Sequence, residues 1–159
     1  MARRSAGILL YRRSGDEPEL LLVHPGGPFW ARKDEGVWSI PKGEYTDDED
    51  PRAAALREFE EELGTEAPAD ADALLDLGEV KQRSGKVVTA YAVEGDLDPD
   101  RIRSNTFATE WPPRSGQTRE FPEVDRAAWF APDEARAKLN PAQAELVDRL
   151  LERLTASCS

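Results

Sequence analysis

The stretch from Asp50 to Gly64 constrains the fold most strongly, because it carries both ends of one helix. Asp50 precedes Pro51, and an aspartate N-cap followed by proline at the first helical position is a typical helix start. Gly64 follows the last apolar residue and is typical of a helix end. We therefore predict a helix over about residues 51–63.

The predicted helix has two chemically different faces, because residues three and four apart lie on the same side. The apolar positions are expected to be buried, and the acidic positions are expected to share the polar face. The apolar set is Ala55, Leu56, Phe59 and Leu63; the acidic set is Glu58, Glu61 and Glu62. Arg57 lies one turn before Glu61 and is expected to pair with it.

The acidic face has two interpretations. A charge run usually faces water, so a solvated surface is the simpler one. However, these glutamates lie in the C-terminal half of the helix, where the macrodipole disfavours negative charge. A hard divalent cation would offset that cost, since Mg²⁺ takes oxygen ligands from carboxylates and substrate phosphates. The pattern therefore favours a Mg²⁺ site, with Mn²⁺ as the expected substitute.

The rest of the chain has the pattern of a single mixed α and β domain over residues 1–159. Short apolar runs predict strands at 5–13, 19–25, 37–41, 73–82, 86–96, 106–111 and 127–131. Further helices are predicted at 132–139 and at about 141–154. Segments 26–36, 42–50 and 112–126 are rich in Gly, Pro or charge and are expected to be loops.

Composition excludes several classes of protein. The net charge of −11 argues against a basic surface for nucleic acid, although an acidic protein can bind phosphates through a divalent cation. The single cysteine, Cys158, excludes a disulfide framework. No apolar run approaches the ~18 residues of a membrane span, so we expect no membrane partner and a cytoplasmic location. Nothing in the pattern indicates an oligomeric state.

The spacing of Gly43, Glu49 and the segment REFEEELG at 57–64 resembles the Nudix box, G-x5-E-x7-R-E-U-x-E-E-x-G-U, where U is a bulky aliphatic residue. Every charged and glycine position matches. Phe59 stands at one U position, and Thr65 replaces the last U with a smaller, more polar residue. The resemblance implies an α+β fold: an α/β/α sandwich with a mixed central sheet, containing the two helices predicted at 51–63 and 141–154.

The resemblance also implies a Mg²⁺-dependent hydrolase that cleaves a pyrophosphate linkage in a nucleoside diphosphate joined to another moiety. Arg57 would orient the glutamates, and Glu49 would brace the loop against the helix or take part in catalysis. The implied metal ligands are the side chains of Glu58, Glu61 and Glu62 and the carbonyl of Gly43. Such an ion neutralises charge on the phosphoryl oxygens and lowers the pKa of a bound water.

The general base is not fixed by the resemblance, because some relatives use a glutamate of the box, such as Glu58 or Glu61, and others use one from a later loop. Glu123, six residues before Trp129, is the first candidate outside the box, and Glu120 is the second. Both are alternatively ordinary solvated loop charges.

Candidate substrate-binding residues lie on both sides of the box. Lys42 precedes Gly43 and is expected either to contact a phosphate or to be solvated. Basic residues at the predicted hairpin tip would hold a polyphosphate tail or serve solubility; these are Lys81, Arg83 and Lys86.

Several aromatic residues are candidates for stacking on a nucleobase, while others are expected in the core. The stacking candidates are Tyr45, Phe29, Trp30 and Trp111. Trp38 is expected to be buried. His24 is the only histidine and is expected to be structural.

The layout before the box resembles the dinucleoside-tetraphosphate hydrolase and MutT-like NTP pyrophosphohydrolase branch, with an Ala-Gly strand start and a Trp before Pro-Lys-Gly. Dinucleoside polyphosphates or nucleoside triphosphates therefore rank first as substrates. Nucleotide sugars, RNA 5′ ends and diphosphoinositol phosphates follow. The alternative is a Nudix-fold module that senses a nucleotide without cleaving it, although such proteins usually lose box glutamates.

Overall fold

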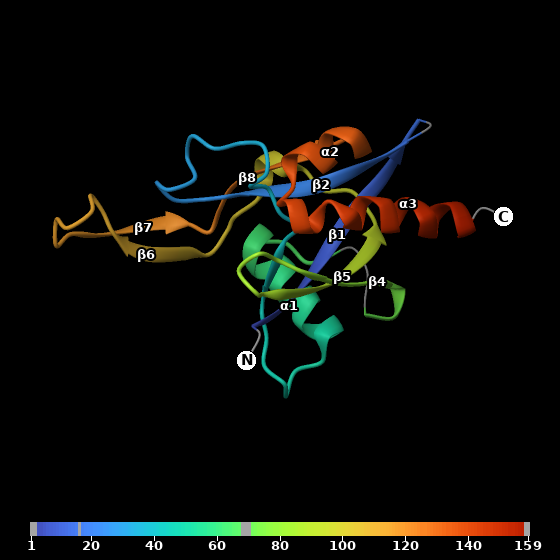
Figure 1. The fold of residues 1–159 in the computed structure, drawn as a ribbon, viewed down its shortest axis with the longest axis horizontal. Coiled ribbons are helices and arrows are strands. Elements are labelled where there is room, and N and C mark those ends of the chain that lie inside the picture. The colour runs from blue at the N-terminus through green and yellow to red at the C-terminus, as the bar shows by residue number, and fades with distance from the viewer. Residues whose placement is uncertain (1–2, 16, 68–70, 158–159) are drawn as a thin grey trace.

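A mixed sheet lies between helices that cover its two faces (Figure 1) in the computed structural model, which describes residues 3–15, 17–67 and 71–157. The strands are β1 Arg4–Ser14, β2 Glu17–Pro25, β3 Lys42–Glu44, β4 Leu75–Lys81, β5 Val87–Glu94, β6 Thr106–Glu110, β7 Thr118–Pro122 and β8 Val124–Phe130. The helices are α1 Pro51–Leu63, α2 Pro132–Lys138 and α3 Glu145–Ser157, with short 3-10 turns at Ala71–Ala73, Pro99–Arg101 and Pro141–Gln143. Cys158 lies outside the described residues.

The sheet is built around β1. Its strands follow the order β4-β5-β1-β2-β8, with β1 and β5 parallel and the other neighbours antiparallel. The second half of β1 pairs with β2, whereas residues 5–7 pair with β3. Because the first residues of β1 pair with β3, Gly43 lies opposite Ala6, within the sheet and facing α1.

Two hydrophobic cores fill the space on either side of the sheet, because successive side chains of a strand point to opposite faces. Ala6, Ile8 and Leu10 of β1 pack on the side of α1, together with Phe59. Leu9 of β1 packs on the other side, with residues of α3. The predicted sandwich is therefore confirmed.

The ends of α1 agree with the prediction from the sequence. The carboxylate of Asp50 accepts a hydrogen bond from the backbone N–H of Arg52 at 3.3 Å. Gly64 adopts the left-handed conformation with φ of 72°, and its N–H donates to the carbonyl of Glu60. Local capping chemistry is enough to define this helix.

Two predictions about elements are wrong. Residues 37–41 form only isolated bridges through Trp38 and Ser39, and the strand begins at Lys42, inside the predicted loop 42–50. The predicted loop 112–126 contains β7 and the start of β8. The predicted C-terminal helix is confirmed: α3 covers Glu145–Ser157, and the 3-10 turn at Pro141–Gln143 precedes it.

The strands β6 and β7 form a separate two-stranded sheet that projects from the body (Figure 1). We call residues 105–123 the arm. Its base is held by backbone hydrogen bonds to the end of α1, from Arg103 N–H to the carbonyl of Leu63 at 2.9 Å and from Asn105 N–H to the carbonyl of Glu61 at 3.1 Å. In the described part of the chain, no helix has the length and apolar character needed to cross a membrane.

Candidate active site

Glu58 lies against the backbone of β3 rather than in solvent. A Cβ atom placed on Gly43 would lie only 2.0 Å from Oε2 of Glu58, so any larger residue would displace this carboxylate. The residue is 9% exposed, and burial raises the pKa of its carboxyl group. The glycine of the box is therefore needed for close approach of a carboxylate.

Glu62 is the second buried glutamate of α1, with 8% of its surface exposed. Both of its carboxylate oxygens lie 3.3 Å from the backbone N–H of Lys42, which donates to them. Burial raises the pKa of Glu62 to about 8, and Glu123 and Glu58 add to this effect. The alternative of a fully solvated acidic face, which the sequence disfavoured, is thus excluded for Glu58 and Glu62, because both lie against β3.

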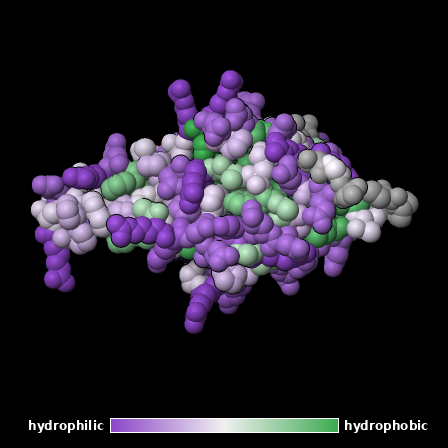
Figure 2. Space-filling model, turned by 90° about the horizontal axis from the view of Figure 1, so that it is seen from above, coloured by the Kyte–Doolittle hydropathy of each residue, from purple (hydrophilic) through white to green (hydrophobic). Residues whose placement is uncertain are grey.

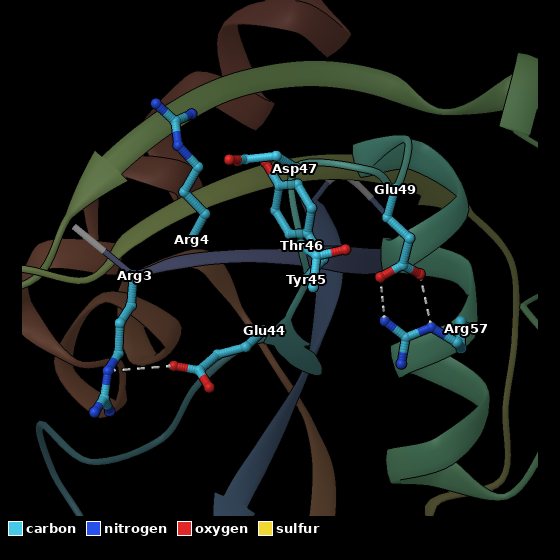
Figure 3. A pocket seen from close by; sticks show the side chains of 8 residues that line it. All are labelled: Arg3, Arg4, Glu44, Tyr45, Thr46, Asp47, Glu49 and Arg57. Atoms are coloured by element: carbon cyan, nitrogen blue, oxygen red, sulfur yellow. Dashed lines mark hydrogen bonds and ion pairs between the residues drawn. The ribbon is translucent and has the colours of Figure 1, made fainter. Parts of the chain in front are cut away.

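Arg57 connects the loop before α1 to the glutamates. It donates two hydrogen bonds of 2.9 Å to the carboxylate of Glu49 (Figure 3). Its Nη1 donates to Glu58 at 2.7 Å and to Glu61 at 3.3 Å. The expected pair with Glu61 is present, and one guanidinium holds three carboxylates in fixed positions.

Glu123 joins this cluster from the base of the arm. Burial and the charge of Glu61 raise the pKa of Glu123. The carboxylates of Glu61 and Glu123 are therefore within electrostatic reach of each other. The backbone N–H of Glu123 donates to the carbonyl of Asn105 at 2.8 Å. The hydroxyl of Ser104 donates to that same carbonyl at 2.8 Å and accepts from the N–H of Val124 at 2.9 Å.

Glu120 is separated from the cluster, because it lies exposed on β7 opposite Ala108. Of the two candidates outside the box, the geometry therefore favours Glu123. The contacts of Ser104 and Asn105 were not anticipated from the sequence, since they depend on how the arm returns to the end of α1.

The donor chemistry of the cluster fits a hard divalent cation. Glu58, Glu61, Glu62 and Glu123 offer carboxylate oxygens, and burial, together with repulsion among these carboxylates, raises the pKa values of Glu58 and Glu62. A divalent cation relieves such repulsion. Over residues 3–15, 17–67 and 71–157, no three His, Cys, Asp or Glu side chains are already arranged as a metal site. Arg57 and the Lys42 N–H hold the carboxylates instead, so cation binding requires side-chain rotation.

An open cleft of about 1030 Å³ lies beside Arg57 and Glu49 (Figure 3). Tyr45 contributes to its wall, as do the positively charged side chains of Arg3 and Arg4 at the start of β1. Arg3 forms an ion pair of 3.8 Å with Glu44. Arg3 and Arg4 were not predicted as site residues, because only the pairing of β1 with β3 brings them to this cleft.

The basic candidates divide into two groups. The ammonium group of Lys42 lies near Lys86, and burial followed by this like charge lowers the pKa of Lys42. Lys81 and Arg83 are exposed at the hairpin between β4 and β5. Among these basic candidates, only Lys42 and Lys86 lie close to each other and are partly buried.

His24 and Trp38 are buried, as expected. Nδ1 of His24 lies 2.8 Å from a carboxylate oxygen of Asp125, and Nε2 donates to the carbonyl of Lys33 at 2.6 Å. The indole N–H of Trp38 donates to Asp34 at 2.7 Å. These contacts fix the loop between β2 and β3, where Phe29 and Trp30 are exposed.

Comparisons with known proteins agree with this arrangement. Residues 1–150 match the family model described as the NUDIX domain. Over 72 residues the chain is 39% identical to an RNA pyrophosphohydrolase of Gluconacetobacter diazotrophicus, and the match covers 40% of this chain and 38% of that protein. The matched segment thus spans less than half of that relative.

Two solved structures share the fold at low sequence identity. A C. elegans Ap4A hydrolase binary complex has a TM-score of 0.64 and 19% identity, covering 96% of this chain and 98% of that one. The NUDIX domain of Shewanella oneidensis NrtR, complexed with ADP ribose, has a TM-score of 0.65 and 18% identity, covering 97% and 89%. The family match, supported by the same fold, shows that the chain belongs to the Nudix family.

Proposed function

We propose that this protein is a Mg²⁺-dependent hydrolase that cleaves a pyrophosphate linkage in a nucleotide, with a dinucleoside polyphosphate or nucleoside triphosphate as the first-ranked substrate. The observation that carries the proposal is the burial of Glu58 against Gly43, beside Glu62 and under the hydrogen bonds of Arg57. A merely solvated acidic surface would not require a glycine at that contact. Every charged position of the box is retained, which argues against a sensor without activity.

The contacts support the following roles. Glu58, Glu61 and Glu62, with the carbonyl of Gly43, would hold the ion, which when bound supplies charge neutralisation and a more acidic water. Arg57 keeps Glu58 and Glu61 in position through its hydrogen bonds. Lys42 and Lys86 would contact the substrate phosphates, whose negative charge would offset the burial of Lys42 and the repulsion between the two ammonium groups.

Glu123 is the proposed general base. Its pKa is raised, so its carboxylate binds a proton more readily than an ordinary glutamate, and it faces Glu61 across the cluster. Its backbone is held at Asn105, which fixes the carboxylate relative to α1. Replacing Glu123 by Gln is expected to lower kcat by roughly 10²-fold or more.

A substrate panel tests the proposal. The panel contains dinucleoside polyphosphates, nucleoside triphosphates, nucleotide sugars, a 5′-triphosphorylated RNA and a diphosphoinositol phosphate, with Mg²⁺ or Mn²⁺, in ¹⁸O-labelled water. Mass analysis of the products identifies the phosphorus that is attacked. E61Q is expected to lose activity by roughly 10²-fold, while E60Q, which changes an exposed neighbour, should retain it. Tight nucleotide binding by the wild type without any turnover would instead indicate a sensor.

RNA 5′ ends are the second candidate substrate, since the curated relative with 39% identity over 72 residues is named an RNA pyrophosphohydrolase. The net charge of −11 disfavours binding along an RNA backbone. The panel distinguishes these two candidate substrates. If the RNA is hydrolysed faster than the free nucleoside triphosphate that matches its 5′ nucleotide, the protein must contact RNA beyond that nucleotide.

A further inference from the structure

Two large aromatic side chains are unusually exposed among the residues that the structure describes. Phe29 is 60% and Trp30 is 39% exposed, in the loop between β2 and β3. Trp111 at the end of β6 lies against Phe29, with ring centroids 5.9 Å apart and an interplanar angle of 79°. We call Phe29, Trp30 and Trp111 the aromatic platform. Exposed apolar surface occurs at the end of the molecule to which the arm projects (Figure 2), and such surface typically marks a binding site.

The aromatic platform is fixed in place, so its exposure does not come from a loose loop. Gly27 packs on Phe107 of the arm so closely that an added Cβ would lie 2.8 Å from the ring. The N–H of Trp30 donates to the carbonyl of Gly27 at 3.3 Å, and the N–H of Lys33 donates to the carbonyl of Trp30 at 2.9 Å. The carbonyl of Lys33 is in turn held by buried His24.

The aromatic platform shares its backbone anchor with the carboxylate cluster. The N–H of Gly26 donates to the carbonyl of Glu123 at 2.9 Å, and a Cβ on Gly26 would lie 2.0 Å from the carbonyl oxygen of Pro122. Through Asn105, Glu123 is connected to the carbonyl of Glu61. One continuous set of backbone hydrogen bonds therefore fixes the loop of Phe29 and Trp30 relative to Glu61 and Glu123.

The chemistry of the aromatic platform suits a nucleobase attached to phosphate. Aromatic faces stack on nucleobases of any identity, because every base has a π-face. The ammonium group of Lys33 lies 5.2 Å from the ring centroid of Trp30 and adds a positive charge beside the rings. The hydrogen bond from Gly26 to Glu123 connects this loop to the carboxylate cluster, which favours a ligand that carries both a base and phosphates.

We propose that the aromatic platform binds a nucleobase of the substrate while the carboxylate cluster acts on its phosphates. This inference rests on the proposed function for the identity of the substrate, and it adds a binding site on the loop and the arm. Its test is a binding measurement, so that it does not depend on turnover.

The test compares ligands with and without a base. The affinities of the four nucleoside 5′-monophosphates and of ribose 5-phosphate are measured by calorimetry for the wild type, F29L and W30L. Leucine keeps apolar bulk but removes the aromatic face. We expect the preferred monophosphate to bind roughly 5- to 100-fold more weakly to the variants, and ribose 5-phosphate to bind as before. F121L, which changes another ring of the arm, is the control and should alter neither affinity.

Several results would overturn the inference. It fails if the wild type binds no monophosphate more tightly than ribose 5-phosphate, or if F29L and W30L weaken both ligands equally. It also fails if F121L weakens the monophosphate as much as W30L does. Sedimentation of the wild type and W30L tests whether this surface binds a second copy of the chain. A wild-type dimer that dissociates in W30L would show that it does.

Failure of the proposed function gives a different result. If no substrate of the panel is hydrolysed but F29L and W30L still lose affinity for the monophosphate alone, the base site stands and the hydrolase assignment fails. If substrate is hydrolysed and F29L and W30L leave KM and monophosphate affinity unchanged, the hydrolase assignment stands and the base site fails.

Discussion

Removing the buried charge of Glu62 is expected to change how the stability of the metal-free protein depends on pH. The pKa of Glu62 is raised from 4.5 to about 8, mainly by burial. Between these values the folded protein retains a proton that the unfolded chain has lost, so the free energy of unfolding falls as pH rises. One pKa unit corresponds to about 1.4 kcal/mol, so this group lowers the free energy of unfolding by up to about 5 kcal/mol.

The E62Q variant has no proton to lose at this position. Urea unfolding with EDTA, at steps from about pH 5 to about pH 8.5, is expected to show a smaller decline for E62Q than for the wild type. E60Q is the matched control, because Glu60 lies on the same helix but is exposed. Parallel stability curves for the wild type and E62Q would refute the reasoning.

Mg²⁺ provides an independent check of the same group. An ion that binds the folded state raises the melting temperature by mass action, and it binds best when its carboxylate ligands are ionised. The rise caused by Mg²⁺ should therefore be larger at about pH 8.5 than at about pH 6 in the wild type. In E62Q the rise should be smaller and less dependent on pH. An equal rise in both proteins at both pH values would exclude Glu62 as a ligand.

Three further substitutions test individual contacts. G43A is expected to displace Glu58 and to weaken the Mg²⁺-dependent rise in melting temperature, since its Cβ would lie 2.0 Å from Oε2; an unchanged rise contradicts this contact. S104A is expected to lower kcat by roughly 10-fold with little change in KM, because the hydroxyl accepts from the N–H of Val124 and donates to the Asn105 carbonyl that also accepts from the N–H of Glu123. S104A should have no further effect in an E123Q background, and an additive loss would show another role. R57K is expected to lower activity by about 10- to 100-fold, because lysine cannot form the two parallel hydrogen bonds to Glu49, and retained activity would exclude this bracing role.

The sequence predicted α1 to the residue because its signals are local. The Asp50 cap, Pro51 at the first helical position and Gly64 at the end act within a few residues of the helix that they define. In contrast, β7 was missed because its residues are almost all exposed, so no alternation of buried and exposed positions marks it as a strand. Its pairing with β6 is a long-range contact that the pattern of neither segment contains.

The difference between local signals and long-range contacts also applies to the candidate site. Helical spacing brought Glu58, Glu61 and Glu62 together, but it did not predict which of them are buried. That depends on β3, a strand of three residues whose position comes from its pairing with the distant start of β1. Burial matters chemically, because it raises the pKa of Glu62 to about 8. Glu61, on the same helix, is more exposed.

The charge balance of the cluster shows why a cation remains the best explanation of the whole arrangement. Nε and Nη2 of Arg57 are both used by Glu49, and Nη1 is shared between Glu58 and Glu61. Arg57 therefore offers one positive charge to three carboxylates. Glu62 and Glu123 are two further carboxylates without a share in this guanidinium, and the charge of Glu123 adds to burial in raising the pKa values of Glu58 and Glu62. A divalent ion supplies charge of the required sign and size, and Gly43 leaves room for the carboxylate nearest the backbone.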